Sequence, residues 1–126
     1  MDALSNKKIS LRINVLKAAR TRIEWTFNTF SRICISFSGG KDSTTLLHLA
    51  ADHARKNGKK FDIVFIDWEA QFSHTISHIE KMRSLYQDVI GHFYWVALPI
   101  TTENSVSQFQ PEWQCWTPNT NWIRKP

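Results

Sequence analysis

Residues 32–43 read Arg32-Ile33-Cys34-Ile35-Ser36-Phe37-Ser38-Gly39-Gly40-Lys41-Asp42-Ser43. The first half is a short run rich in β-branched residues, and a serine and two glycines follow it at once. This pattern predicts a buried strand over residues 32–37 that ends in a tight turn. From Ser43 to Asn57 the apolar residues recur at helical spacing, and Gly58 is placed to end that helix as a left-handed cap. The stretch therefore predicts a strand, a loop and a helix in direct succession.

The chain that follows repeats this alternation. Residues 61–67 are almost continuously apolar, as is typical of parallel strands covered on both faces. We expect a helix from Ser73 or Thr75 to about Tyr86, and a third strand over residues 93–98. Alternating strands and helices predict an α/β fold, in which right-handed crossovers place the three strands parallel in the order 3-2-1.

The two ends of the chain differ from this middle part. Residues 5–29 contain no proline or glycine and carry apolar side chains at helical spacing, which predicts an amphipathic helix that covers the sheet. An alternative is a basic helix that binds nucleic acid, because Lys17, Arg20 and Arg22 lie close together. The C-terminal part is rich in tryptophan and proline and is expected to be an irregular tail. The predicted parts are an N-terminal helix, an α/β half-domain and this tail, over residues 1–30, 31–100 and 101–126.

Composition limits the class of protein. The chain has 126 residues, with 16 lysines and arginines against 11 acidic residues, and a net charge of +5. This size fits one domain, and the basic balance suits anionic partners such as nucleotides or nucleic acid. No segment resembles a signal peptide or a membrane span, so we expect a cytoplasmic protein without membrane contact.

The cysteines and histidines predict no zinc site, iron–sulfur site or disulfide framework. Cys34 lies in an apolar run and is expected in the core. Cys115, in the tail, is either a reactive thiol or an ordinary tail residue. His74 and His78 are one helical turn apart, but no Glu-x-x-His companion accompanies them, so surface or capping roles are expected.

The predicted chemistry is concentrated in the glycine loop, residues 38–43. Adjacent glycines adopt conformations forbidden to other residues and let the backbone approach a phosphate closely. Successive N–H groups and the positive end of the following helix then form an anion site. We expect Lys41 to add a mobile charge and the hydroxyls of Ser36, Ser38 and Ser43 to donate to phosphate oxygens. The loop matches neither the Gly-x4-Gly-Lys-Ser/Thr nor the Gly-x-Gly-x-x-Gly pattern.

Three acidic residues are candidates for supporting roles. Asp42 is expected to cap the helix, hold the loop or coordinate nucleotide-bound Mg²⁺. Asp67, at the end of the second strand, is a candidate ligand for a ribose hydroxyl or for the metal, and a capping or turn role is the alternative. Glu69 is either a second ligand or a solvated loop acid. Three tail residues either stack on a base or pack against a neighbouring surface: Trp113, Trp116 and Trp122.

The loop Ser38-Gly39-Gly40-Lys41-Asp42-Ser43 resembles the PP-loop of the ATP pyrophosphatase superfamily. Within that superfamily the chain is most similar, over about residues 32–98, to the phosphoadenosine phosphosulfate (PAPS) reductase family. That family follows its second strand with Asp-Thr-Gly, then Phe and Glu-Thr. The matching positions are Asp67, Phe72 and Thr75. The departing positions are Trp68, Glu69 and His74. The resemblance implies nucleotide contacts from the loop, from Asp67 and from Thr75.

A narrower resemblance rests on Asp67-Trp68-Glu69 and on Pro111-Glu112-Trp113-Gln114-Cys115-Trp116. These segments are similar to a subgroup that includes PAPS sulfurtransferases and the immunoglobulin-binding regulator A type of prophage co-activator. Those proteins are longer and are thought to work with ParB-like partners. The resemblance therefore implies a ParB-like partner for this chain.

The family resemblance also implies an adenine nucleotide α-hydrolase-like, Rossmann-like fold with five strands, of which this chain matches the N-terminal half. A three-stranded half would leave the edge beside its first strand uncovered, which favours a protein partner or a homodimer.

Two reactions follow from the resemblance, with ATP or PAPS as the bound nucleotide. In the first, an acceptor oxygen attacks the α-phosphorus and pyrophosphate departs, with Lys41 and Asp42 as candidate catalytic residues and Mg²⁺ held by Asp42 or Asp67. In the second, a thiol attacks the sulfur and no metal is needed. The family's C-terminal Glu-Cys-Gly-Leu-His segment is absent, and Cys115 does not match it. The alternative function is a non-catalytic co-activator module whose loop binds nucleotide for partner control.

Overall fold

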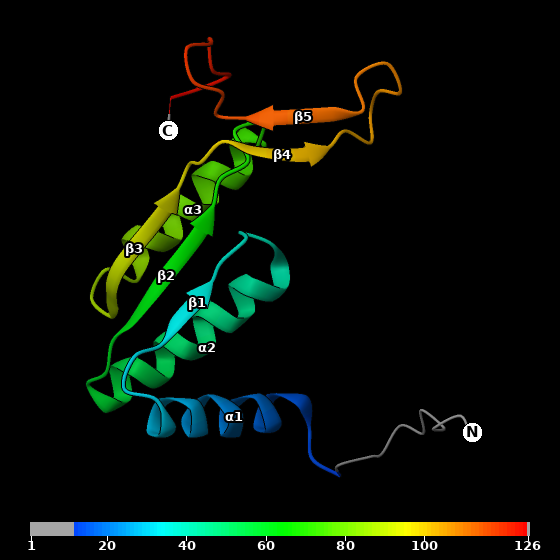
Figure 1. The fold of residues 1–126 in the computed structure, drawn as a ribbon. Helices are drawn as coiled ribbons and strands as arrows, with labels where there is room; N and C mark the ends of the chain where they lie inside the picture. The colour runs from blue at the N-terminus through cyan, green and yellow to red at the C-terminus, as the bar shows by residue number, and fades with distance from the viewer. Residues whose placement is uncertain (1–11, 126) are drawn as a thin grey trace.

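The computed structural model describes residues 12–125 and has a three-stranded parallel sheet at its centre (Figure 1). The strands are β1 (Cys34–Ser36), β2 (Phe61–Ile66) and β3 (Ile90–Val96), in the spatial order β1-β2-β3. The predicted α/β class, parallel pairing and strand order are therefore confirmed. Strand β3 begins three residues earlier than predicted, and its extra residues form an irregularity opposite Asp62.

Two helices pack against one face of the sheet. Helices α2 (Lys41–Asn57) and α3 (Ser73–Leu85) lie behind the strands in Figure 1. The side chains of β2 that face them are buried and alternate with partly or fully exposed ones, and Ile63 and Phe65 are 0% and 1% exposed. Gly58 ends α2 in the left-handed conformation with φ of 60°, as predicted.

The opposite face of the sheet is open among the described residues. Ile66 and Tyr94 are 43% and 45% exposed, and Cys34 is also exposed. The predictions that β2 is covered on both faces and that Cys34 lies in the core are therefore wrong for this structure. Both crossovers step across the sheet in the same direction, and right-handed connections then put both helices on one side.

The first helix is shorter than predicted. Helix α1 (Val15–Thr29) begins after Asn14, whose side chain accepts a hydrogen bond from the backbone N–H of Lys17 at 2.8 Å. Residues 12–14 are not helical, and the earlier part of the predicted helix lies outside the described residues.

Helix α1 packs against α2 across the end of the sheet where the strands begin, instead of covering the sheet as predicted (Figure 1). It buries Ile23 and Phe27, and the ring of Phe27 meets the ring of Phe61 edge-on at 6.1 Å. The ammonium of Lys59 donates to the Phe27 carbonyl at 2.8 Å. A cation at the end of a helix satisfies a carbonyl that has no partner within the helix.

The C-terminal part contains regular structure where an irregular tail was expected. Strands β4 (Ile100–Glu103) and β5 (Glu112–Cys115) form an antiparallel hairpin beside the carboxyl ends of β2 and β3 (Figure 1). The segment after β5 then folds back to contact residues that follow β2. None of the helices within residues 12–125 has the length and apolar character that a membrane crossing requires. The proposed domain boundaries and the cytoplasmic location stay predictions.

Candidate functional site

The glycine loop connects β1 to α2 and contains a position where a side chain would be strained and crowded. Gly39 has φ of +76°, in the region that side-chain-bearing residues rarely adopt. A Cβ atom there would lie 3.2 Å from side-chain carbons of both Ile79 and Thr75 on α3. The loop is therefore packed directly against α3, which brings Thr75, predicted from the family pattern, next to the loop.

The start of α2 presents free backbone donors. Gly40 is the N-cap residue and supplies no side-chain bond to the helix. The N–H groups of the first three helical residues have no acceptor within the helix, and the helix dipole adds partial positive charge there. These residues are Lys41, Asp42 and Ser43. An anion in front of this end would meet several N–H donors at once.

Two serine hydroxyls close the loop. The Oγ atoms of Ser38 and Ser43 are 3.0 Å apart, and the Ser43 hydroxyl lies 3.1 Å from the Gly40 carbonyl, to which it donates. The Gly40 N–H points to the Ser38 Oγ at 3.4 Å. These groups form a small closed set of hydrogen bonds. To bind a phosphate, the serine hydroxyls would donate to its oxygens in place of these internal acceptors.

Lys41 and Asp42 pair with each other in solvent. The Lys41 Nζ is 2.7 Å from the Asp42 Oδ1, and the two side chains are 89% and 90% exposed. Such exposed pairs are weak, so both side chains are free to turn toward a ligand. The described residues contain no group of three or more potential metal ligands, and the Mg²⁺ roles of Asp42 and Asp67 stay predictions. Ser36 is exposed on the open sheet face, two residues before the loop.

Asp67 is held by the protein in this structure. Its carboxylate is fully buried and accepts from the Trp95 indole N–H at 2.6 Å, from the Arg124 guanidinium, and from the Glu69 backbone N–H at 2.9 Å. A ligand role for Asp67 would require Arg124 to move away. Neither Trp95 nor Arg124 was a sequence candidate, since Arg124 lies 57 residues from Asp67 and no local pattern links them.

Glu69 anchors the segment that follows β5. It is 4% exposed and accepts from the backbone N–H groups of Trp116 at 2.5 Å and Ile123 at 2.8 Å. The expectation of a solvated acid is wrong for this buried Glu69, and its role as a second ligand stays a prediction. Trp116 is 3% exposed and donates its indole N–H to the Asp67 carbonyl at 2.7 Å. Trp116 therefore packs inside the protein in this structure and is not exposed for stacking on a base.

Neither cysteine has the features of an activated nucleophile. Cys115 is fully buried, and desolvation by burial is the largest cause that raises the pKa of its thiol. Desolvation, followed by the negative charge of Asp62, also raises the pKa of the Cys34 thiol. Both groups are therefore held in the thiol form at neutral pH, whereas attack requires the thiolate.

His78 links the two helices beside the loop. Its Nε2 lies 2.9 Å from the Thr44 Oγ1, so it joins α3 to the first turn of α2. His74 is exposed one turn earlier on α3. Sequence reasoning placed both residues as surface or capping histidines and missed the bond between Thr44 and His78.

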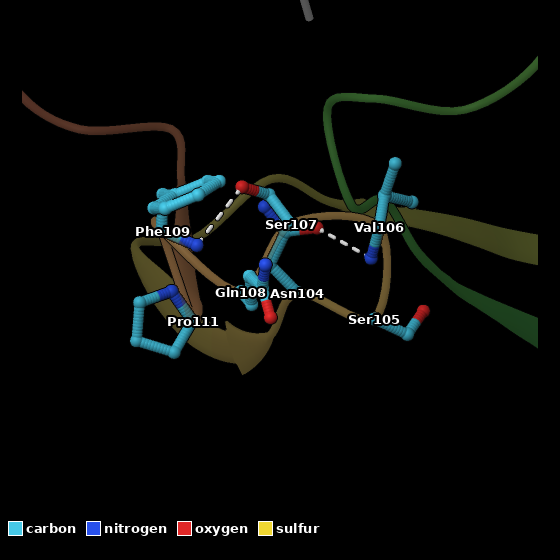
Figure 2. Close-up of a pocket in the computed structure, with 7 residues that line it drawn as sticks. All are labelled: Asn104, Ser105, Val106, Ser107, Gln108, Phe109 and Pro111. Carbon is cyan, nitrogen blue, oxygen red and sulfur yellow. Dashed lines mark hydrogen bonds between the residues drawn. The ribbon is translucent and has the colours of Figure 1, made fainter.

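A separate hollow of about 550 Å³ lies within the loop that joins β4 to β5 (Figure 2). Figure 2 shows hydrogen bonds between lining residues of this loop. The Asn104 Oδ1 accepts from the Val106 N–H at 3.1 Å, and the Ser107 Oγ accepts from the Phe109 N–H at 3.3 Å. No lining residue is charged, so this hollow lacks the cations that phosphate binding needs.

Residues 32–122 match the family model of the phosphoadenosine phosphosulfate reductase domain. The chain belongs to the PAPS reductase family. Its three-stranded sheet and glycine loop are thus a PAPS reductase-type nucleotide-binding fold. The narrower assignment to the sulfurtransferase and co-activator subgroup stays a prediction.

Two relatives of unknown function are similar to this PAPS reductase-family chain. The uncharacterized protein YbdN of Escherichia coli is 61% identical over 123 residues, which are 98% of this chain and 30% of YbdN. The uncharacterized protein MJ0066 of Methanocaldococcus jannaschii is 35% identical over 71 residues, which are 53% of this chain and 14% of that protein. The chain therefore spans less than a third of the length of either relative. No solved structure matches it.

Proposed function

We propose that the chain binds an adenine nucleotide, ATP or PAPS, with its phosphates at the glycine loop. The observation that carries this proposal is the exposed start of α2, where three backbone N–H groups have no acceptor within the helix and no side chain caps them. Gly39 supports it, because its positive φ gives the loop a conformation that side-chain-bearing residues rarely adopt and that lets a backbone approach a phosphate closely.

Each loop side chain has a role in this proposal. Lys41 turns from Asp42 to the phosphates, and the hydroxyls of Ser38 and Ser43 donate to phosphate oxygens in place of their internal acceptors. Asp42 holds Mg²⁺ together with phosphate oxygens and water, as is usual for this ion. A ribose hydroxyl reaches Asp67 once Arg124 has moved away, and Thr75 lies beside the phosphates.

The proposed chemistry is nucleotidyl or sulfur-group transfer. In nucleotidyl transfer an acceptor oxygen bonds to the α-phosphorus, the bond to the bridging oxygen breaks, and pyrophosphate carries the electron pair away. The loop N–H groups and Lys41 stabilise that leaving charge. In sulfur-group transfer the attacking thiol would come from outside the described residues, since Cys115 is buried and the pKa of the Cys34 thiol is raised.

Calorimetric titration with ATP plus Mg²⁺, and separately with PAPS, tests the nucleotide proposal. We expect one site per chain and a loss of affinity of at least ten-fold in Lys41→Ala, because the ammonium contributes a charge-assisted bond worth about 1.5–3 kcal/mol. Lys60→Ala is the matched control, since Lys60 is an exposed lysine at the opposite end of β2. A folded protein that binds neither nucleotide would refute the proposal, as would equal losses in the two variants.

A second candidate is a co-activator module that binds nucleotide without turning it over. The open sheet face and the exposed edge strand β1 favour it, because they give a protein partner a surface to complete. The partner in this proposal is a ParB-like protein or a second copy of the chain. Release of pyrophosphate or sulfite by nucleotide-bound protein would argue for the first candidate. Nucleotide-dependent complex formation without release would argue for the second.

A further inference from the structure

A cleft separate from the glycine loop lies between α3 and the segment that contains Arg124 and Lys125. Its volume is about 430 Å³, and its walls come from Ile76, Glu80 and Arg83 of α3, from Trp95 of β3, and from Arg124 and Lys125. On α3 the spacing of four and three residues places the first three on one helix face. Thr75 and Ile79, which contact the glycine loop position Gly39, do not line the cleft.

The charge of the cleft is positive. Arg83, Arg124 and Lys125 contribute three cations, whereas Glu80 is the one carboxylate among the lining residues. Asp67 balances Arg124, so a surplus of one positive charge remains. The guanidinium of Arg83 lies 5.4 Å from the centre of the Phe93 ring, and no carboxylate in residues 12–125 pairs with Arg83 or Lys125.

Arg124 is fixed in place but still has donors to spare. It is held by Asp67 on one nitrogen and by the Trp116 ring, whose centre lies 5.2 Å from the guanidinium carbon. Its Nε is buried without a partner, and its Nη1 has a long contact of 3.4 Å with the Lys125 carbonyl. A guanidinium has five N–H donors in a rigid plane, so this one is pre-organised to receive an oxyanion after a small adjustment.

We propose that this cleft binds a small organic anion that carries a phosphate or sulfate group. The oxyanion lies between Arg83, Arg124 and Lys125, which is the chemistry that guanidinium and ammonium groups recognise. The organic part packs on Ile76 and Trp95, because the cleft is larger than one tetrahedral anion and these two residues supply its apolar wall. This site uses Arg124 in its position against Asp67, so a ribose hydroxyl that displaced Arg124 from Asp67 would compete with it.

Titration of the 126-residue chain with phenyl phosphate and with phenyl sulfate tests this proposal, with backbone amide and indole N–H signals followed by NMR. Inorganic phosphate and phenol serve as probes of the two halves of the ligand. All titrations are run on the Lys41→Ala variant, in which anion binding at the glycine loop is expected to be weaker. We expect the Trp95 indole signal to shift and the Gly39 and Gly40 amides to stay in place. The stronger of the two organic probes identifies the preferred anion.

Charge variants of the lining residues make the test specific. We expect Arg83→Gln and Lys125→Gln each to weaken phenyl phosphate binding about three-fold, because each removes one exposed cation from the anion site. Glu80→Gln should strengthen binding by a similar factor, because it removes the one opposing charge. Lys81→Gln is the matched control, since it removes a cation from the same helix outside the cleft.

Three results would overturn the proposal. The first is a folded chain in which neither organic probe shifts the Trp95 indole signal. The second is a set of shifts confined to the Gly39 and Gly40 amides, since the anion would then occupy the glycine loop even without Lys41. The third is an equal loss of affinity in Lys81→Gln and Arg83→Gln, which would indicate attraction by net charge without a defined site.

Discussion

The indole N–H of Trp116 donates to the backbone carbonyl of Asp67 at 2.7 Å, across 49 residues of sequence. This bond attaches the segment after β5 to the end of β2, where Glu69 and Arg124 add further contacts. The carboxyl end of β2 is therefore closed by the chain's own C-terminal segment, while the glycine loop beside it stays exposed. The two ends of the predicted nucleotide site thus differ in their access to a ligand.

Replacement of Trp116 by phenylalanine should destabilise the fold. The ring volume is largely retained, but the Asp67 carbonyl loses its donor in a buried position, which costs about 1–3 kcal/mol. Urea unfolding measures this loss. Trp25→Phe is the control, because Trp25 is 60% exposed and its replacement should change the unfolding free energy by less than about 0.5 kcal/mol. Equal effects of the two substitutions would contradict the anchoring role of Trp116.

Gly39→Ala should abolish nucleotide binding, whereas Gly58→Ala should not. Both glycines have positive φ, so each substitution strains the backbone by roughly 1–2 kcal/mol. At Gly39 the new methyl group also presses on Thr75 and Ile79 at 3.2 Å, whereas at Gly58 nothing lies within 4 Å. Urea unfolding and nucleotide calorimetry on both variants separate strain from crowding. Retained binding in folded Gly39→Ala would show that the loop tolerates a side chain.

The central fold was predictable because its signals are local. Alternation of apolar strands with helical patterns, together with Gly58 as a helix end, gave the order and type of β1, α2, β2, α3 and β3 correctly. The start of α1 was misplaced because apolar spacing continues before Asn14, while the side chain of Asn14 caps the helix there. The exposure of Cys34 was missed because an apolar run does not reveal which face of a sheet lacks a covering layer.

The candidate site was predictable in part for the same reason. The glycine loop is six consecutive residues, so its chemistry is visible in the sequence. The partners of Asp67 come from β3 and from the C-terminal segment, at separations of 28 and 57 residues. No local pattern marks Trp95 or Arg124 as neighbours of a carboxylate, so their contacts with Asp67 could be found only from the folded chain.

Asp62→Asn should remove a part of the stability that depends on pH. The backbone N–H of His92 is the largest cause that lowers the pKa of the Asp62 carboxyl, with further contributions from the His92 side chain and Arg32. A lowered pKa in the folded state stabilises the fold above the unfolded value of about 4, and this contribution is lost as pH falls below it. The asparagine retains the acceptor for His92 but never carries the charge.

Unfolding free energies of both proteins between pH 2 and pH 7 measure this effect. We expect the wild type to be the more stable protein above about pH 4 and the difference to shrink as the pH falls further. A difference that stays constant across the whole range would show that Asp62 makes no contribution linked to its protonation.

The two cysteines should differ in their reaction with a thiol-specific reagent. Cys34 is exposed on the open sheet face, so it reacts in the folded protein, slowly at neutral pH and faster as the pH rises, because its thiol pKa is raised. Cys115 is fully buried at the end of β5 and reacts when denaturant unfolds the chain. Counting the modified thiols by absorbance, before and after denaturation, measures both reactions.

Cys34→Ser is the control for this assignment, and it should leave no thiol that reacts in the folded state. The result bears directly on the sulfur-transfer reaction, since a nucleophilic thiol would react fast at neutral pH even without substrate. Rapid modification of Cys115 in the folded protein would place a usable thiol beside Glu69 and Asp67 and would return that residue to the list of candidate nucleophiles. Slow modification of Cys34 alone would require the thiol for sulfur transfer to come from another segment or molecule.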